Sequence, residues 1–135
     1  MAKSQYIVVV GCGRLGSILG TQLSDQGNSV VVIDLNESAF ESLGGEFSGF
    51  KIVGDATELA VLRTAKAGKA DCLLAVTDSD NINIMVAQIA KKLFEIPTVL
   101  ARVFDPNREA IYRDFGIETI SPTQLSAEAF VKTIG

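Results

Sequence analysis

An apolar run that ends in a Gly-x-Gly-x-x-Gly turn constrains the fold of this chain more than any other segment. Residues 7–10 read Ile-Val-Val-Val, and Gly11, Gly13 and Gly16 follow at once. A run that is apolar at consecutive positions predicts a parallel strand with both faces covered by helices. The first glycine permits a tight turn, the second lets a phosphate approach the backbone, and the third lets the next helix pack on the strand.

A helix over residues 15–26 and a second apolar strand over residues 29–33 follow the glycine turn. The amide groups and the positive dipole end of that helix would face an anion. Asp34 ends the second strand and follows Gly16 by 18 positions, close to the offset of about 20 at which an acid binds a ribose hydroxyl. An aspartate at a strand end is also a common turn or cap residue, but beside the glycine turn we assign Asp34 to a ligand.

Strands and helices alternate along the rest of the chain. The pattern predicts helices over 36–43, 58–66, 81–94, 106–115 and from 122 onward, and strands over 50–53, 71–76, 98–103 and 117–120. Because βαβ crossovers are right-handed, the six strands predict an α/β, Rossmann-like, doubly wound parallel sheet in the order 3-2-1-4-5-6. A ligand is then expected at the switch point beyond the first and fourth strands. Residues 1–135 are expected to form one domain.

The helix predicted over residues 81–94 has a clear apolar face. Five of its residues recur at helical spacing and form the expected buried stripe, namely Ile82, Met85, Val86, Ile89 and Leu93. The polar turn at residues 77–80 precedes this helix and is expected to cap it. Two aspartates in that turn, Asp78 and Asp80, are more typical of helix caps that complement the dipole than of a metal site.

The composition argues against several classes of protein. The net charge is −4 and the basic residues are scattered, so no stripe exists to bind nucleic-acid phosphates. No apolar run approaches the roughly 20 residues that cross a bilayer, and no signal peptide is visible, so we expect a cytoplasmic protein.

The absence of histidine removes histidine-assisted hydride transfer, histidine triads and histidine-bound zinc. Cys12 and Cys72 are predicted at opposite ends of the sheet, too far apart for a disulfide.

Each loop at the expected switch point suits one part of an adenine nucleotide. The glycine turn would hold phosphates, Asp34 would bind the ribose, and the backbone of residues 54–57 would pair with the adenine edge while Asp55 orders that loop. Arg14 in the glycine turn can reach a terminal phosphate with bidentate geometry.

Arg102 interrupts an otherwise apolar strand, and a charge in a covered strand needs a partner. The partner would be Asp78, Asp80 or a ligand phosphate. The full set of predicted cofactor-binding residues is Gly11, Cys12, Gly13, Arg14, Leu15, Gly16, Asp34, Leu35, Gly54, Asp55, Ala56, Thr77, Asp78 and Arg102.

Five short motifs carry a resemblance to a known family. They are V-V-G-C-G-R-L-G at 9–16, V-V-V-I-D at 30–34, V-G-D-A-T at 53–57, A-V-T-D-S-D-N-I-N at 75–83 and A-R-V at 101–103. Together they resemble the N-terminal nucleotide-binding domain of the RCK family, also called TrkA-N or KTN, which regulates potassium channels and transporters. The G-D-A-T and T-D-x-D-N pieces separate this family from ordinary dehydrogenases better than the glycines do.

The resemblance implies a cytoplasmic sensor without catalytic activity, located at the inner face of the membrane through its partner. It implies a homodimer or higher ring that couples nucleotide occupancy to a membrane potassium-translocating subunit. The implied ligand is ATP, ADP or NAD(H), with AMP able to occupy the same site. The Gly-x-Gly-Arg-x-Gly pattern is similar to that of the members that respond to ATP and ADP, in which Arg14 would meet the terminal phosphate.

Two features depart from the usual pattern of the family. The C-terminal RCK domain is absent, so we expect it on a separate chain or in a longer protein. Thr123 follows Pro122 where potassium-transport members often carry an acid that contributes to an intersubunit cation site.

Two other functions remain open at this stage. A small NAD(P)-dependent oxidoreductase would need a substrate domain and a Tyr-x-x-x-Lys pair, and the sequence contains neither. A ligand sensor for a partner unrelated to potassium has the same sequence features as the potassium regulator.

Overall fold

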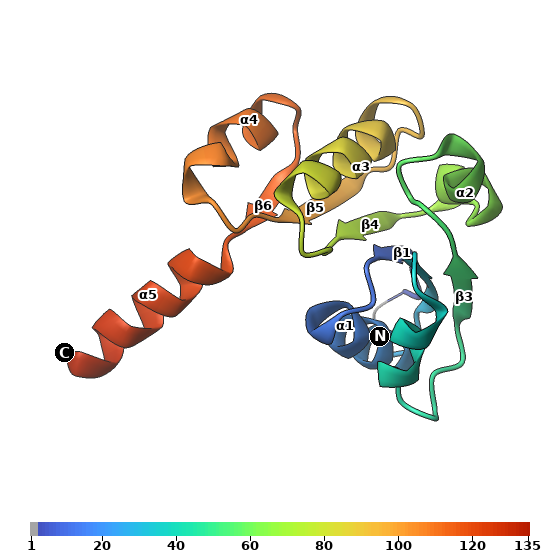
Figure 1. Cartoon of the computed structure of the whole chain (residues 1–135), viewed down its shortest axis with the longest axis horizontal. Coiled ribbons are helices and arrows are strands. Elements are labelled where there is room, and N and C mark those ends of the chain that lie inside the picture. The colour runs from blue at the N-terminus through green and yellow to red at the C-terminus, as the bar shows by residue number, and fades with distance from the viewer. Residues whose placement is uncertain (1–2) are drawn as a thin grey trace.

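Six parallel strands form one sheet in the computed structural model, which describes residues 3–135 (Figure 1). The strands are β1 (Tyr6–Val10), β2 (Ser29–Asp34), β3 (Phe50–Val53), β4 (Cys72–Ala75), β5 (Thr98–Arg102) and β6 (Glu118–Ile120). Their spatial order is β3-β2-β1-β4-β5-β6, and each neighbouring pair is parallel. The predicted fold class and strand order are confirmed.

Helices connect the strands and cover the sheet. The α-helices are α1 (Arg14–Asp25), α2 (Leu59–Thr64), α3 (Asp80–Lys92), α4 (Glu109–Asp114) and α5 (Pro122–Ile134), and the 3-10 helices are η1 (Glu37–Ser42), η2 (Ala67–Lys69) and η3 (Pro106–Arg108). Helix α1 and η1 pack on one face, whereas α2, α3 and α4 pack on the other. The layers follow from right-handed crossovers that wind in both directions from β1.

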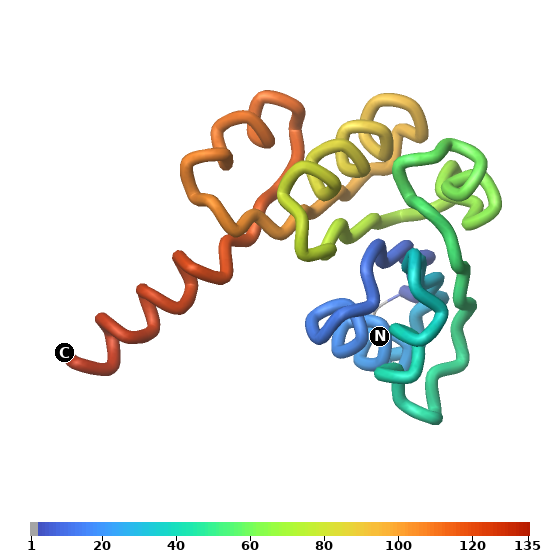
Figure 2. Tube along the Cα trace, viewed as in Figure 1, coloured from blue at the N-terminus to red at the C-terminus, as the bar shows by residue number. Residues whose placement is uncertain are grey.

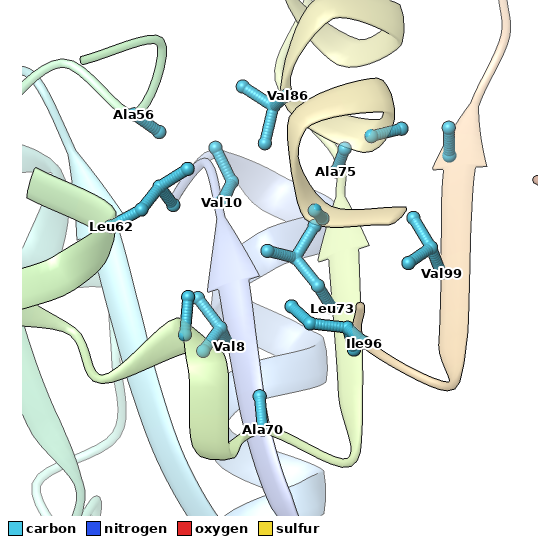
Figure 3. Close-up of a cluster of buried hydrophobic side chains, with 14 of the residues drawn as sticks. Val8, Val10, Ala56, Leu62, Ala70, Leu73, Ala75, Val86, Ile96 and Val99 are labelled. Atoms are coloured by element: carbon cyan, nitrogen blue, oxygen red, sulfur yellow. The ribbon is translucent and has the colours of Figure 1, made fainter. Parts of the chain in front are cut away.

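Strand β1 is the centre of both hydrophobic clusters because successive side chains of a strand point to opposite faces. Val8 and Val10 lie in one cluster with Leu62 of α2 and Val86 of α3 (Figure 3). Ile7 and Val9 pack toward α1 and η1. All four strand residues are buried, as the consecutive apolar run predicts.

The segment predicted as a helix over residues 36–43 is a 3-10 helix instead. Asn36 provides no side-chain cap, so the start of an α-helix is not stabilised there. Phe40 and Leu43 are both buried against the sheet. Residues three apart align on one side of a 3-10 helix, so this geometry turns both toward the core. The helix predicted over 106–115 is likewise divided into η3 and α4.

The predicted buried stripe of α3 is wrong at two positions. Met85 and Leu93 are 49% and 64% exposed. The buried residues of α3 are Asn83, Val86, Ala87 and Ala90, with Ile82 and Ile89 packed beside them. The alanines let α3 lie close to the sheet. The buried face of α3 therefore centres on small residues, and the bulky Met85 lies outside that face.

Helix α5 leaves the sheet and extends away from the rest of the chain (Figures 1 and 2). Ser121 caps it by accepting a hydrogen bond from Gln124 N, and Pro122 occupies its first turn. None of its residues is buried. The predicted C-terminal helix is therefore present, but its apolar side chains contact little of their own chain.

Two further expectations concern the cysteines and membrane spans. Cys12 and Cys72 are both buried and free, as predicted from their positions at opposite ends of the sheet. Across residues 3–135, no helix has the length and apolar character required to span a bilayer.

Candidate functional site

Four loops meet beyond the carboxyl ends of β1 to β4. The Gly11 amide donates to Ile33 O at 2.8 Å, and the Gly54 amide donates to Asp34 O at 2.9 Å. These hydrogen bonds extend the parallel ladder past the strand ends and hold the loops side by side. The convergence predicted at the switch point is therefore present.

Two cavities open at this edge of the sheet. They share five lining residues, namely Gly11, Asp34, Leu35, Thr77 and Asp78. The smaller cavity measures about 140 Å³ and continues along Gly54, Asp55 and Ala56. The larger measures about 530 Å³ and continues along Gly13, Arg14 and Arg102.

Most of the predicted site residues line these two cavities. The exceptions are Cys12, Leu15 and Gly16. Cys12 and Gly16 are buried, and Leu15 packs toward the sheet in the α1 cluster. A separate hollow of about 600 Å³ over η1 and β3 contains none of the predicted residues, so we place the candidate site at the shared pair of cavities.

The three glycines of the turn serve different purposes. Gly11 has a φ of 104°, a conformation that side chains disfavour. A Cβ atom on Gly16 would lie 1.8 Å from Gly11 O. At Gly13, however, φ is −78° and a Cβ atom would meet nothing within 4 Å. The fold itself therefore requires Gly11 and Gly16, whereas Gly13 leaves free space over the backbone inside the larger cavity.

The start of α1 faces the same free space. Gly13 is the N-cap and makes no side-chain hydrogen bond, and no acidic residue stands in the first turn. The first amide groups of a helix have no partner within the helix. They carry partial positive charge, so this end of α1 is suited to bind an anion.

Asp34 lies between the two cavities. Its Oδ2 accepts a hydrogen bond from the Cys12 amide at 2.8 Å, and its Oδ1 accepts one from the Asn36 amide at 2.9 Å. An ionised carboxylate has about four acceptor positions, so hydroxyl donors can still bind. Burial, and secondarily the Asp34 charge, raise the pKa of the Cys12 thiol, so Cys12 contributes its amide and not a reactive thiolate.

Asp55 orders the loop after β3. Its Oδ1 accepts hydrogen bonds from Thr57 N at 2.9 Å and from Thr57 Oγ1 at 2.6 Å. These bonds hold the pKa of the Asp55 carboxyl below its usual range. The loop backbone at Gly54 and Ala56 is thereby fixed along the smaller cavity.

Main-chain carbonyls hold Arg102, and the predicted carboxylate partners do not. Its Nη2 donates to Val76 O at 2.8 Å and to Thr77 O at 2.9 Å. Asp80 instead accepts from two amides of the loop after β5, those of Phe104 and Asp105. The predicted pairing with Asp78 or Asp80 is therefore wrong, because loop amides already engage the Asp80 carboxylate.

The Arg102 guanidinium retains unused hydrogen-bonding capacity. Its Nε is buried without a hydrogen-bond partner among the described residues. The Phe104 ring packs on the guanidinium, 4.7 Å from its centroid to Cζ. Burial lowers the pKa of Arg102, although Asp78 and Asp80 oppose that effect.

Asn83 is a residue of this site that sequence reasoning missed. It is 0% exposed. Its Oδ1 accepts from Thr77 N and Thr77 Oγ1, and its Nδ2 donates to Thr77 O and Arg102 O, at 2.7 to 3.1 Å. Asn83 thus ties the ends of β4 and β5 together. The available signal was a polar residue on the inner face of α3, where a buried amide must find partners.

The polar turn at residues 77–80 caps α3, as predicted, and the capping side chain is that of Ser79. Ser79 is the N-cap, and its hydroxyl accepts a hydrogen bond from Ile82 N at 3.3 Å. Asp80 lies in the first turn, where it complements the dipole. Asp78 is exposed and lines both cavities.

A family model described as the TrkA-N domain matches residues 7–122. The Trk system potassium uptake protein TrkA of Streptomyces coelicolor is 36% identical over 129 residues, which cover 96% of this chain and 58% of that protein. The chain thus spans less than two thirds of the length of this relative.

Solved structures share the fold. The TrkA-N domain of the inner membrane protein ybaL from Escherichia coli has a TM-score of 0.87 at 18% identity, with 100% of both chains covered. The Kef CTD of Shewanella denitrificans, in an AMP-bound form, has a TM-score of 0.79 at 24% identity over 95% of this chain and 81% of that chain.

Two structures of GsuK are also similar. The channel bound to NAD has a TM-score of 0.71 at 24% identity, over 89% of this chain and 22% of that chain. GsuK bound to ADP has a TM-score of 0.76 at 19% identity, over 91% of this chain and 32% of that chain. With the family model matching most of its length, the chain belongs to the TrkA-N domain family.

Proposed function

We propose that this chain is the nucleotide-binding domain of a cytoplasmic regulatory subunit of a potassium uptake system, and that it catalyses no reaction. The observation that carries the nucleotide part is the free space over Gly13 at the uncapped start of α1. The potassium part is supported by the relative from S. coelicolor, which is named a potassium uptake protein.

The two cavities divide the nucleotide between them. The smaller cavity would take the adenine, whose edge pairs with the backbone at Gly54 and Ala56 while Leu35 covers a face. Asp34 would accept hydrogen bonds from the ribose hydroxyls. The amides at the start of α1 would bind the first phosphates, because the N-terminal end of a helix carries a partial positive charge that attracts an anion.

The far end of the larger cavity favours a polyphosphate. Arg14 and Arg102 both line it, and guanidinium groups bind phosphate oxygens with charge-assisted hydrogen bonds. The phosphates beyond the first in ATP or ADP would contact Arg14 and Arg102. AMP would fill only the adenine and first-phosphate positions. NAD(H) remains the second candidate ligand, because a similar structure is described as bound to NAD.

An oxidoreductase has less support. Histidine is absent from the sequence. The hydroxyls of Tyr6 and Tyr112 donate to the carbonyls of Ala65 and Asp80, and burial raises the pKa of Tyr112 to about 12. Neither tyrosine lines the two cavities, so neither is placed to transfer a proton there.

A second copy of the chain would cover an apolar groove beside the site. The groove measures about 380 Å³ and is lined by Leu15 and Leu19 of α1, Leu74 and Leu100 of the sheet, and Ile120. On this face α1 contacts β1 and β2, which leaves the sides of β5 and β6 open. Contiguous exposed apolar surface of this kind marks an interaction site.

Helix α5 offers a matching surface. Phe130 and Val131 are consecutive, Ile134 lies about one turn further along, and the three are 71%, 70% and 86% exposed, so they form an uncovered stripe. Because one chain presents both an open groove and an unpartnered apolar helix, two copies related by a two-fold axis can bury both at once. We therefore propose a homodimer, or a ring built from such dimers, with α5 in the partner's groove.

Nucleotide occupancy would act by shifting the population of dimer arrangements. Ligand contacts Asp34 and Arg14 on one side of the crevice and Arg102 on the other, and it can favour one arrangement only by its differential affinity. The favoured arrangement would then be transmitted to a membrane potassium-translocating subunit.

Gly13→Ala should weaken nucleotide binding without unfolding the protein. We expect at least a tenfold loss of ATP affinity by calorimetry, about the cost of overpacking a tight contact. The free energy of unfolding, measured in urea, should change by less than about 0.5 kcal/mol. Gly16→Ala is the contrasting variant, because its collision with Gly11 O should lower stability by about 1 to 3 kcal/mol. Wild-type protein that binds none of ATP, ADP, AMP and NADH would contradict the proposal.

Arg14→Ala should weaken ATP binding much more than AMP binding. Loss of a charge-assisted hydrogen bond to the terminal phosphate predicts about a tenfold to hundredfold loss for ATP. Arg63 is an exposed arginine on α2. The substitution Arg63→Ala is the matched control and should leave the affinities for ATP and AMP unchanged. Equal losses for ATP and AMP on Arg14→Ala would remove the terminal-phosphate role.

Phe130→Asp combined with Val131→Asp should convert the dimer to a monomer in sedimentation experiments. Two charges cannot be buried in an apolar groove without a large desolvation cost. Lys132→Glu changes charge on the polar side of α5 and should leave the dimer intact. A wild-type protein that is monomeric at micromolar concentration would contradict the proposed interface.

Small-angle scattering of the full assembly, including any partner chain, should differ between ATP and ADP. The third phosphate is the expected signal, since ATP places one more phosphate beside Arg14 and Arg102 than ADP does. Identical profiles for the two nucleotides would leave no conformational change to transmit.

A further inference from the structure

The Asp34 residue connects three of the four loops at the site. Its carboxylate accepts hydrogen bonds from the Cys12 amide at 2.8 Å and from the Asn36 amide at 2.9 Å. Its main-chain oxygen accepts one from the Gly54 amide at 2.9 Å. The first of these bonds reaches into the middle of the glycine turn, 22 residues earlier in the sequence.

We propose that Asp34 is a positioning residue for the phosphate end of the site, in addition to its role as the ribose acceptor. Its carboxylate fixes the peptide of Cys12 and so sets the direction of the amides that follow at the start of α1. This inference rests on the proposed nucleotide function and adds a phosphate-directed role to it.

Three contacts hold the glycine turn around the Cys12 amide: Gly11 N donates to Ile33 O, Gly13 O accepts from Ser17 N, and the Cys12 side chain packs in the core. Asp34 is the acceptor for the Cys12 amide within the described residues. A Cβ atom on Gly13 would touch nothing within 4 Å, so no side chain covers the peptide that follows Cys12. An amide that loses its partner in a buried setting seeks another arrangement, because leaving it unpaired is costly.

Neutralising the Asp34 carboxylate distinguishes a positioning role from a role in ribose binding alone. A carboxylate close to a phosphate site repels the phosphate. If Asp34 served only the ribose, neutralising it would leave binding of a phosphate ligand without ribose unchanged or make it tighter. If Asp34 positions the turn, neutralising it makes that binding weaker. The two roles therefore predict opposite signs.

Asp34→Asn is the test variant. The Cys12 and Asn36 amides bind different oxygens of the carboxylate. Asparagine replaces one of these oxygens with an NH2 group that donates, so in this geometry it cannot accept from both amides. The probe is inorganic tripolyphosphate, which carries neither ribose nor base. We expect its affinity, measured by calorimetry, to fall about tenfold in this variant, the value of one lost charged hydrogen bond.

Glu37→Gln is the charge-matched control, because Glu37 is exposed at the start of η1 and lines neither cavity of the site. It removes one negative charge without loosening the turn, so tripolyphosphate should bind equally well or more tightly. Hydrogen exchange provides a second readout in the protein without nucleotide. Exchange of the Cys12 amide should become faster in Asp34→Asn and stay unchanged in Glu37→Gln.

The outcomes separate this inference from the proposed function. Slower exchange or unchanged exchange at Cys12 in Asp34→Asn overturns the positioning role. So does tripolyphosphate affinity that is unchanged or higher in Asp34→Asn while ATP affinity falls, because Asp34 then acts on the ribose alone. Wild-type protein that binds neither ATP nor tripolyphosphate overturns the proposed function and this inference together.

Discussion

The right-handed crossover between parallel strands decides where this molecule can bind a ligand. From β1 the chain winds through α1 and η1 on one face to β3, and it then returns through α2, α3 and α4 on the other face to β6. The loops after β1 and β4 therefore diverge and leave the two cavities between them. Gly11 and Gly16 allow the chain to turn at that point, so the same backbone that closes the core also presents free amides to the crevice.

Main-chain groups carry most of the proposed phosphate recognition. The protein has a net charge of −4, but an anion at the crevice meets the helix end and two arginines. Local partial charges thus outweigh the net charge at short range, because interactions between exposed charges farther apart than about 10 Å are largely screened. The negative charge of Asp34 is compatible with a nearby phosphate because the Cys12 and Asn36 amides donate hydrogen bonds to its carboxylate.

The sequence predicts those parts of the structure that depend on local pattern. The motif over residues 7–16 and the alternation of elements predicted the sheet and its strand order, and the residue set at the crevice followed from that order. Side-chain partnerships were harder to predict. Arg102 was expected to pair with Asp78, Asp80 or a ligand phosphate, but its Nη2 donates to two carbonyls at the end of β4. Met85 was expected in the core, yet alanines brought α3 close to the sheet and Asn83 took an inward position. These outcomes depend on tertiary distances that spacing along the chain does not contain.

A crystal structure of the protein grown with excess ATP tests the central claim most directly. The account predicts phosphate oxygens within hydrogen-bonding distance of the amides at the start of α1, a ribose at Asp34 and adenine along Gly54 and Ala56. A crevice that stays empty, or one that is filled by the protein's own side chains, would contradict it.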